Sequence, residues 1–187
     1  MKNLLLMMSG LLLCWNAAAK EVAGIKLADT VQVGNATLQL NGAGTRTKVF
    51  FDIYVGALYL SKKTSKADDV LADPGPKRVA LHMVYNMASS SLERAFRNAI
   101  EANHTEAQLQ ALDAPLKKFY AIFAALPGVS NGDVILLDYV PDTGTRVMVN
   151  GVEKGVVEGA ETNRALLRVW LGEHPAETSL KKAMLGG

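Results

Sequence analysis

The chain has 187 residues, of which 49% are hydrophobic and 20% charged, and its 20 Lys and Arg side chains stand against 18 Asp and Glu. This length suits one domain with a substantial core. A formal net charge of +2 is too small to indicate nucleic acid or an anionic membrane as a partner. One Cys and three widely spaced His exclude a Cys/His zinc site and a disulfide within the chain. We expect a compact globular protein with neither metal nor cofactor.

The first nineteen residues are typical of a secretory signal peptide. Lys2 supplies a positive start, residues 4–15 are nearly all apolar, and Ala17-Ala18-Ala19 places small residues at the −3 and −1 positions. We expect cleavage before Lys20 and export to the periplasm, an uncleaved anchor being the alternative. Cys14 would leave with this leader, and no later stretch reaches eighteen apolar residues, so we expect no stable membrane insertion after cleavage.

Residues 20–187 contain no repeat, low-complexity tract or Pro/Gly-rich linker and therefore predict a single domain. Residues 24–40 are typical of short strands with a turn at Gly34-Asn35, and residues 47–60 are dense in β-branched and aromatic side chains. Period-two counting puts four apolar residues of the second stretch on one face: Val49, Phe51, Ile53 and Val55. Pro74-Gly75-Pro76 marks a turn before a further strand at 78–85.

The middle of the chain is predicted to be helical. Ser90-x-x-Glu93 fits a capping box, and apolar residues follow at helical spacing as far as residue 100. Thr105-x-x-Gln108 fits a second capping box. Pro115 either starts a new helical turn or kinks a helix that continues to residue 123.

Strands return after Pro127-Gly128, at residues 134–140, 146–149 and 152–157. Asn150-Gly151 joins the last two and is a strong signal for a type I′ hairpin. Helices are predicted at 161–171 and 179–185. This alternation of strand and helix blocks indicates an α+β fold, with helices packed on one face of a mainly antiparallel sheet.

The chain carries no motif of nucleophilic catalysis, phosphate binding or metal-dependent hydrolysis. The three histidines, His82, His104 and His174, are interpreted as structural or solvated side chains. Gly42-Ala43-Gly44 lacks the spacing of a dinucleotide loop, and no predicted helix follows it to hold a pyrophosphate.

Arg46 is the side chain that best fits a binding role. It stands between the glycine-rich segment and the most hydrophobic strand. It either faces solvent on an edge strand or lies at the mouth of an apolar pocket, where its guanidinium would grip a carboxylate or oxyanion. Tyr54 and Tyr59 could line such a pocket and offer a hydroxyl. The helical wheel leaves open whether Asn98 faces the sheet or solvent.

Three segments of the chain resemble chalcone isomerase and its bacterial relatives. They are Leu40–Arg46 (LNGAGTR), Tyr54–Leu60 (YVGALYL), and Leu171–His174 (LGEH) with Leu180–Lys182 (LKK). Their order and separations match across nearly all of residues 21–187. The resemblance implies an open-faced β-sandwich, in which a layer of helices covers a large antiparallel sheet and a ligand cleft lies between them.

The resemblance also assigns roles to single residues. Arg46 matches the arginine that binds the oxyanion in the isomerases, and Asn98 is a looser match to their helix asparagine. The isomerase tyrosine and one threonine are replaced by Ser91 and Val169, and a second threonine by Tyr54, the residue type seen in fatty-acid-binding relatives. Losing several polar contacts at about 1–3 kcal/mol each would remove most specific catalysis. We therefore expect no catalytic residues and no chalcone cyclisation.

The spacing of the two principal site residues sets a geometric condition. Arg46 and Tyr54 are eight residues apart, which in an unbroken strand is roughly 27 Å at about 3.4 Å per residue. They can share one ligand only if the chain turns or bulges near residues 47–49.

Three functions remain open from the sequence. We favour a periplasmic, non-catalytic binder of a fatty acid or similar amphipathic carboxylate, held by Arg46, Tyr54 and Asn98. The second is an isomerase or intramolecular lyase acting on a small oxyanion-forming substrate. The third is a structural or partner-binding module with a solid core, in which Arg46 pairs with an acid such as Asp52. A cleft well under about 300 Å³ would favour this last function.

Overall fold

The computed structural model describes residues 20–187. Seven strands form one antiparallel sheet in which every strand pairs with its neighbours in sequence, in the order β3-β4-β5-β6-β7-β8-β9. The strands are β3 Thr30–Val33, β4 Ala36–Lys48, β5 Phe51–Leu60, β6 Lys77–Met83, β7 Val134–Val140, β8 Gly144–Val149 and β9 Val152–Val157. A separate two-stranded sheet consists of β1 (Lys20–Val22) and β2 (Ile25–Leu27).

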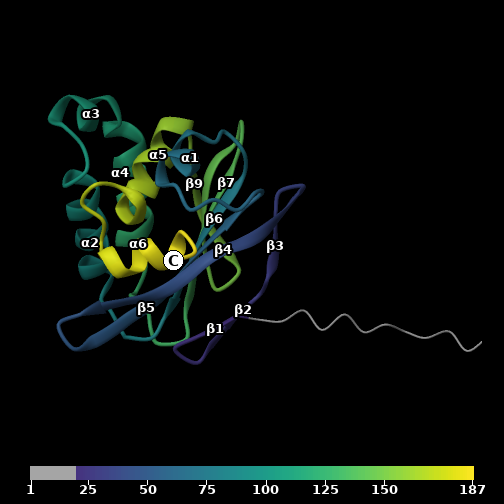
Figure 1. The fold of residues 1–187 in the computed structure, drawn as a ribbon. Coiled ribbons are helices and arrows are strands. Elements are labelled where there is room, and N and C mark those ends of the chain that lie inside the picture. Colours follow the sequence, from purple (N-terminus) through teal and green to yellow (C-terminus); the bar gives the residue numbers. More distant parts are fainter. Residues whose placement is uncertain (1–19) are drawn as a thin grey trace, which may run out of the picture.

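The helices gather on one side of the seven-stranded sheet (Figure 1). They are α1 Ala67–Ala72, α2 Ser89–Glu101, α3 Glu106–Ala111, α4 Asp113–Ala124, α5 Ala160–Leu171 and α6 Thr178–Met184. The main core fills the space between the layers, and at its centre the ring of Phe96 packs against those of Phe119, Phe123 and Trp170. The predicted α+β fold, an antiparallel sheet covered by a layer of helices, is confirmed.

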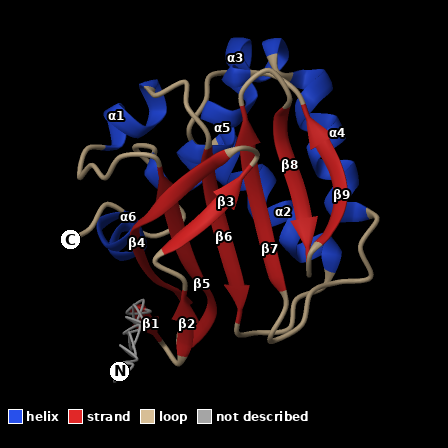
Figure 2. Cartoon of the chain, turned by 90° about the vertical axis from the view of Figure 1, so that its right-hand side faces the viewer, coloured by secondary structure: helices blue, strands red, loops and turns tan. Residues whose placement is uncertain are grey.

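The other face of the sheet is also partly covered. In Figure 2 the helices lie behind the sheet, while β3 and the first part of β4 cross in front of it. Arg78 on β6 donates a 3.2 Å hydrogen bond to the carbonyl oxygen of Gln32 on β3, which ties the curled hairpin down. A second apolar cluster, containing Leu38, Val55 and Tyr59, fills this side. Strand β5 is therefore buried on both faces, which explains its continuous apolar run.

The predicted strand at 47–60 proves to be part of a hairpin. Strand β4 extends to Lys48, the chain turns at Val49 and Phe50, and β5 begins at Phe51. The prediction that Val49 shares one strand face with Phe51, Ile53 and Val55 is wrong, because Val49 lies in the turn. Val49 is 76% exposed and Phe51 59% exposed. Both lie at the hairpin tip, beyond the helices that cover the rest of the strand.

The two predicted capping boxes have different outcomes. Helix α2 begins two residues earlier than the Ser90 box requires, with Ala88 as N-cap and no side-chain cap. The box at Thr105 is confirmed, because its hydroxyl accepts from the Gln108 amide and the Gln108 side chain accepts from the Thr105 amide. Pro115 lies in the first turn of α4, where its missing N–H is not needed.

The predicted type I′ hairpin is confirmed: φ is 52° at Asn150 and 78° at Gly151. Within residues 20–187, no helix is long and apolar enough to cross a membrane. The predicted signal peptide lies at residues 1–19, outside the described part of the chain.

Candidate functional site

The β4–β5 hairpin brings Arg46 and Tyr54 together. The two residues are direct cross-strand partners in the antiparallel register, so their side chains leave the sheet on the same face. The guanidinium carbon of Arg46 lies 5.7 Å from the centre of the Tyr54 ring. The turn at Val49 and Phe50 thus fulfils the geometric condition that the spacing of these residues set.

Tyr54 is held in one orientation by α5. It is 4% exposed, and its hydroxyl oxygen accepts a 2.8 Å hydrogen bond from the indole N–H of Trp170. Burial raises the pKa of the Tyr54 phenol, and the nearby charge of Arg46 opposes this shift only in part. The phenol therefore keeps its proton at neutral pH, and its O–H can donate to an acceptor placed beside Arg46.

A small apolar space adjoins this pair, between α2, α5 and the loop before α6. Its lining consists of Arg46, Tyr54, Leu92, Ala95, Phe96, Ala99, Val169 and Ala176. The volume is about 20 Å³, room for roughly one water molecule. This is far below the roughly 300 Å³ at which ligand pockets begin, so α2 closes the site in this conformation.

The charge of Arg46 is not neutralised by an ion pair. The side chain is half-buried, and the ion pairs between residues 20 and 187 do not include it. The predicted alternative partner Asp52 instead accepts a 2.7 Å hydrogen bond from the Thr47 hydroxyl. Glu177 accepts from the backbone N–H of Thr47 at 2.6 Å. The pairing of Arg46 with Asp52 is therefore wrong, and the guanidinium remains available to an anion.

Two other candidate residues lie away from this space. Asn98 is exposed on α2 and is not part of the lining, because the inward face of the helix is formed by Leu92, Phe96 and Ile100. The geometry therefore removes Asn98 from the predicted site. Tyr59 belongs to the apolar cluster on the opposite face of the sheet, since it is an odd number of positions from Tyr54 along β5.

The polar chemistry of the space is limited to Arg46 and Tyr54. Val169, which the resemblance matches to a threonine of the isomerases, lines it with an apolar side chain, and Ser91 is exposed on α2. No group of three or more His, Cys, Asp or Glu within residues 20–187 is arranged to hold a metal ion. The arrangement can bind an anion through a cation and a phenol. Sequence reasoning missed Trp170, which has no local signal that marks it as the partner of Tyr54.

The glycine-rich segment before Arg46 has a packing role. A Cβ added to Gly42 would lie 2.1 Å from the backbone oxygen of Ala183, and one added to Gly44 would lie 2.6 Å from the Cβ of Ala183. A Cβ at Gly56 on β5 would come within 3.3 Å of Leu180. Helix α6 thus rests directly on the backbone of β4 and β5. The segments LNGAGTR on β4, YVGALYL on β5 and LKK on α6, which carry the resemblance, therefore pack against one another.

Comparisons with known proteins agree with this architecture. The family described as chalcone isomerase-like matches residues 19–186. Solved structures with a similar fold include a fatty-acid-binding protein of Arabidopsis thaliana, at a TM-score of 0.66 and 16% identity over 87% of this chain and 92% of that one. At this identity the likeness establishes the fold alone. The comparison with curated proteins finds no match.

Proposed function

The chain belongs to the chalcone isomerase-like family, and from this premise we propose that it is a non-catalytic binding protein for a fatty acid or a similar amphipathic carboxylate. The observation that carries the proposal is the half-buried Arg46, which has no ion-pair partner within residues 20–187 and lies over the buried ring of Tyr54. A structural neighbour described as a fatty-acid-binding protein supports the same ligand class.

The head group would be held by two fixed donors. The Arg46 guanidinium donates a charge-assisted, bidentate pair of hydrogen bonds to the carboxylate, and the Tyr54 hydroxyl donates a further one. Trp170 already occupies an acceptor position of that hydroxyl, so the phenolic proton is the part of Tyr54 left for the ligand. Hydrogen bonds to a charged group contribute about 1.5–3 kcal/mol each.

The acyl tail requires α2 to move away from α5. The closed space of about 20 Å³ cannot hold an acyl chain, but its α2 wall is made of Leu92, Ala95, Phe96 and Ala99, which would line a wider cleft with apolar surface. Each buried methylene contributes about 0.8 kcal/mol, so ten of them supply roughly 8 kcal/mol toward separating the helix from its neighbours. Binding then selects an open conformation of α2.

Palmitate binding to residues 20–187, followed by native mass spectrometry and fluorescence displacement, tests the proposal. Arg46→Gln should weaken binding at least 10-fold, because it removes a charge-assisted contact. Lys48→Gln, an equal charge change at an exposed position of the same strand, should leave binding unchanged. Ala99→Leu, which fills the closed space, should also weaken it. Equal affinities for the Arg46 and Lys48 variants would refute the assigned site.

Hydrogen exchange reports on the proposed movement. Palmitate should change amide exchange mainly in α2 and the loop before α6, the two segments that face α5 across the closed space. Exchange that is unchanged throughout α2, in protein shown to carry palmitate, would place the tail elsewhere.

One observation favours a second candidate, a partner-binding module with a solid core. It is the same volume of about 20 Å³, which meets the criterion for a packed interior. The two candidates differ in the palmitate experiment: a module with a solid core takes up no acyl ligand at any palmitate concentration, and Ala99→Leu leaves its behaviour unchanged.

We also propose that the protein is exported to the periplasm, on the basis of the pattern in residues 1–19. N-terminal sequencing of the protein recovered from a periplasmic fraction should begin at Lys20. Recovery with Met1 intact from the cytoplasmic fraction would contradict export.

A further inference from the structure

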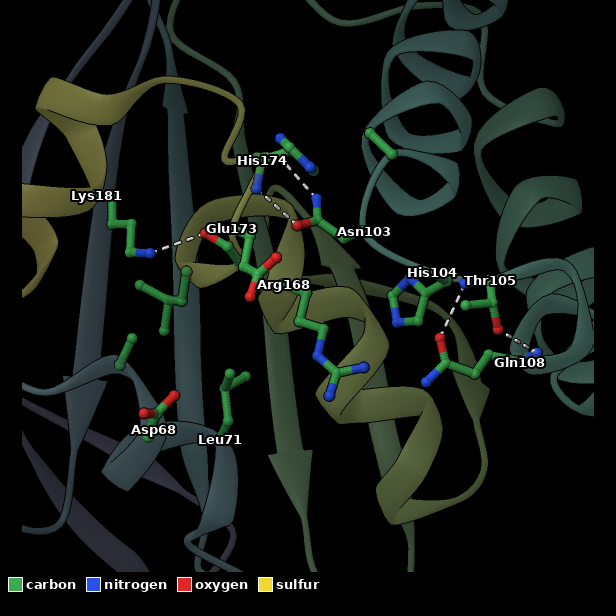
Figure 3. Close-up of a pocket in the computed structure, with 14 residues that line it drawn as sticks. Asp68, Leu71, Asn103, His104, Thr105, Gln108, Arg168, Glu173, His174 and Lys181 are labelled. Carbon is green, nitrogen blue, oxygen red and sulfur yellow. Dashed lines mark hydrogen bonds between the residues drawn. The ribbon is translucent and has the colours of Figure 1, made fainter.

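A second and larger pocket lies on another side of α5. Its volume is about 550 Å³, within the range of small-molecule sites. It is bounded by α1, the end of α2, the start of α3, the last turn of α5 and α6 (Figure 3). Its apolar part includes Leu71 and Leu171. Arg168 and Val169 are consecutive on α5, yet Arg168 lines this pocket and Val169 the closed space beside Arg46. The two sites are therefore separate.

Arg168 gives this pocket a cation without a counter-ion. Its side chain is half-buried, its guanidinium points into the pocket (Figure 3), and the ion pairs of residues 20–187 do not include it. The ammonium group of Lys181 is already bound to the carbonyl oxygen of Gly172 at 2.8 Å. The two carboxylates of the lining, Asp68 and Glu173, are exposed. Arg168 is thus the charge best placed to bind an incoming anion.

His104 adds an unsatisfied acceptor. Its Nδ1 lies 2.7 Å from the carbonyl oxygen of Ile100, and because a carbonyl oxygen only accepts, Nδ1 carries the hydrogen. In the neutral ring Nε2 is then an acceptor. Among residues 20–187 this buried Nε2 has no hydrogen-bond partner, although buried polar atoms in folded proteins are almost always paired. His104 lines the same pocket as Arg168 (Figure 3).

The position of His104 is fixed by its neighbours. Asn103 donates to the carbonyl oxygens of Ala99 and His174 at 2.9 and 2.8 Å, and it accepts from the backbone N–H of His174 at 3.0 Å. This amide ties the end of α2 to the loop after α5. His104 follows Asn103 directly, and Arg168 lies in the last turn of α5, so the two side chains line the same junction.

We propose that this pocket binds a small hydroxycarboxylate. The carboxylate of the ligand receives the paired donors of the Arg168 guanidinium. A hydroxyl group close to that carboxylate donates to Nε2 of His104 and satisfies the orphaned acceptor. Nε2 is buried in the present conformation, so the side chains that cover it have to move aside for the ligand. The apolar side chains of Leu71 and Leu171 contact the carbon skeleton. The site does not depend on the fatty-acid cleft, since none of its lining residues belongs to that cleft.

Malate and succinate form a matched pair of probes, because succinate differs from malate only in lacking the hydroxyl. Isothermal titration of residues 20–187 should show malate binding at least 10-fold more tightly than succinate, since a site with a buried acceptor rejects the analogue that lacks the donor. Arg168→Gln should weaken malate at least 10-fold. Arg94→Gln, an identical change at an exposed α2 position, should not affect malate.

His104→Asn removes Nε2 and keeps a donor near the position of Nδ1. In this variant malate and succinate should bind with equal affinity, at the level of succinate in the unmodified protein. If the variant does not fold, the comparison of the two probes in the unmodified protein still decides the question. Malate binding that is unchanged by Arg168→Gln, or equal malate and succinate affinities in the unmodified protein, would overturn the proposal.

Discussion

Replacement of the glycines under α6 tests the packing at the centre of this fold. In Gly44→Ala the new Cβ would lie 2.6 Å from the Cβ of Ala183, with Leu180 next at 3.5 Å. In Gly42→Ala it would lie 2.1 Å from the backbone oxygen of Ala183 and 2.8 Å from that of Met184. The first clash involves a side chain that can be removed, and the second involves backbone that cannot.

The magnitudes follow from what α6 buries. Leu180 is 1% exposed and Met184 0%, and overpacking a tightly filled site costs about 1–3 kcal/mol, which is the loss expected for Gly44→Ala. Gly42→Ala also separates the 2.7 Å hydrogen bond from the buried Asn41 amide to the carbonyl oxygen of Met184. With about 1–3 kcal/mol for that bond, its loss of unfolding free energy should reach roughly 3–5 kcal/mol.

Ala183→Gly distinguishes the two clashes. Alone it should cost about 1 kcal/mol of helix stability, and in combination it should rescue Gly44→Ala but not Gly42→Ala. Urea unfolding can be followed through Trp170, the one tryptophan of residues 20–187. A coupling energy of about 1–2 kcal/mol is expected for the Gly44 pair. Additive losses at Gly44, or equal rescue of both variants, would refute this account of the segment.

Three further perturbations test other parts of the fold. Asp138→Ala leaves Arg78 without its bidentate partner, at a site where the two side chains are 7% and 14% exposed. It should cost about 3–5 kcal/mol in urea unfolding, and a loss under about 1 kcal/mol would contradict a structural role for the pair. Burial lowers the pKa of His82 from 6.5. Between the lowered pKa and 6.5 only the unfolded chain binds a proton at His82, so the unfolding free energy should fall as the pH drops through this window. The fall should be less steep in His82→Gln. Identical dependences of the unfolding free energy on pH in the two proteins would show that His82 is not its source. Val49 has a φ of 60°, so Val49→Gly should raise the unfolding free energy by up to about 1 kcal/mol, and a clear loss in thermal unfolding would argue against strain there.

The regular elements could be predicted because their signals are local. The apolar spacing of α2, the capping box at Thr105 and the Asn150-Gly151 turn each act within a few residues. The hairpin tip at Val49 and Phe50 could not be predicted in this way. Its residues are β-branched and aromatic, types that favour strands, and they turn because the two strands pair on either side of them.

The residues of the candidate site also fall into those that local sequence signals indicate and those that only the packed structure places. The sequence indicated Arg46 and Tyr54 as candidates through their residue types and the segments around them. It could not place Asn98, because a one-position rotation of a helix moves a side chain by about 100°, enough to turn it from the sheet to solvent. The free charge of Arg168 and the unpartnered Nε2 of His104 also emerge only after α1, α2, α5 and α6 have packed.

Residue order alone determined the α+β class and the succession of strands and helices, and it singled out Arg46 as the candidate anchor for an acidic ligand. Tertiary structure alone decided that this cation lies beside Tyr54, that α2 seals the space next to them, and that a larger polar pocket opens on the other side of α5. The reason is physical: periodicity and turn chemistry act over a few neighbouring residues, whereas a pocket is the space left when segments distant in the chain pack against one another.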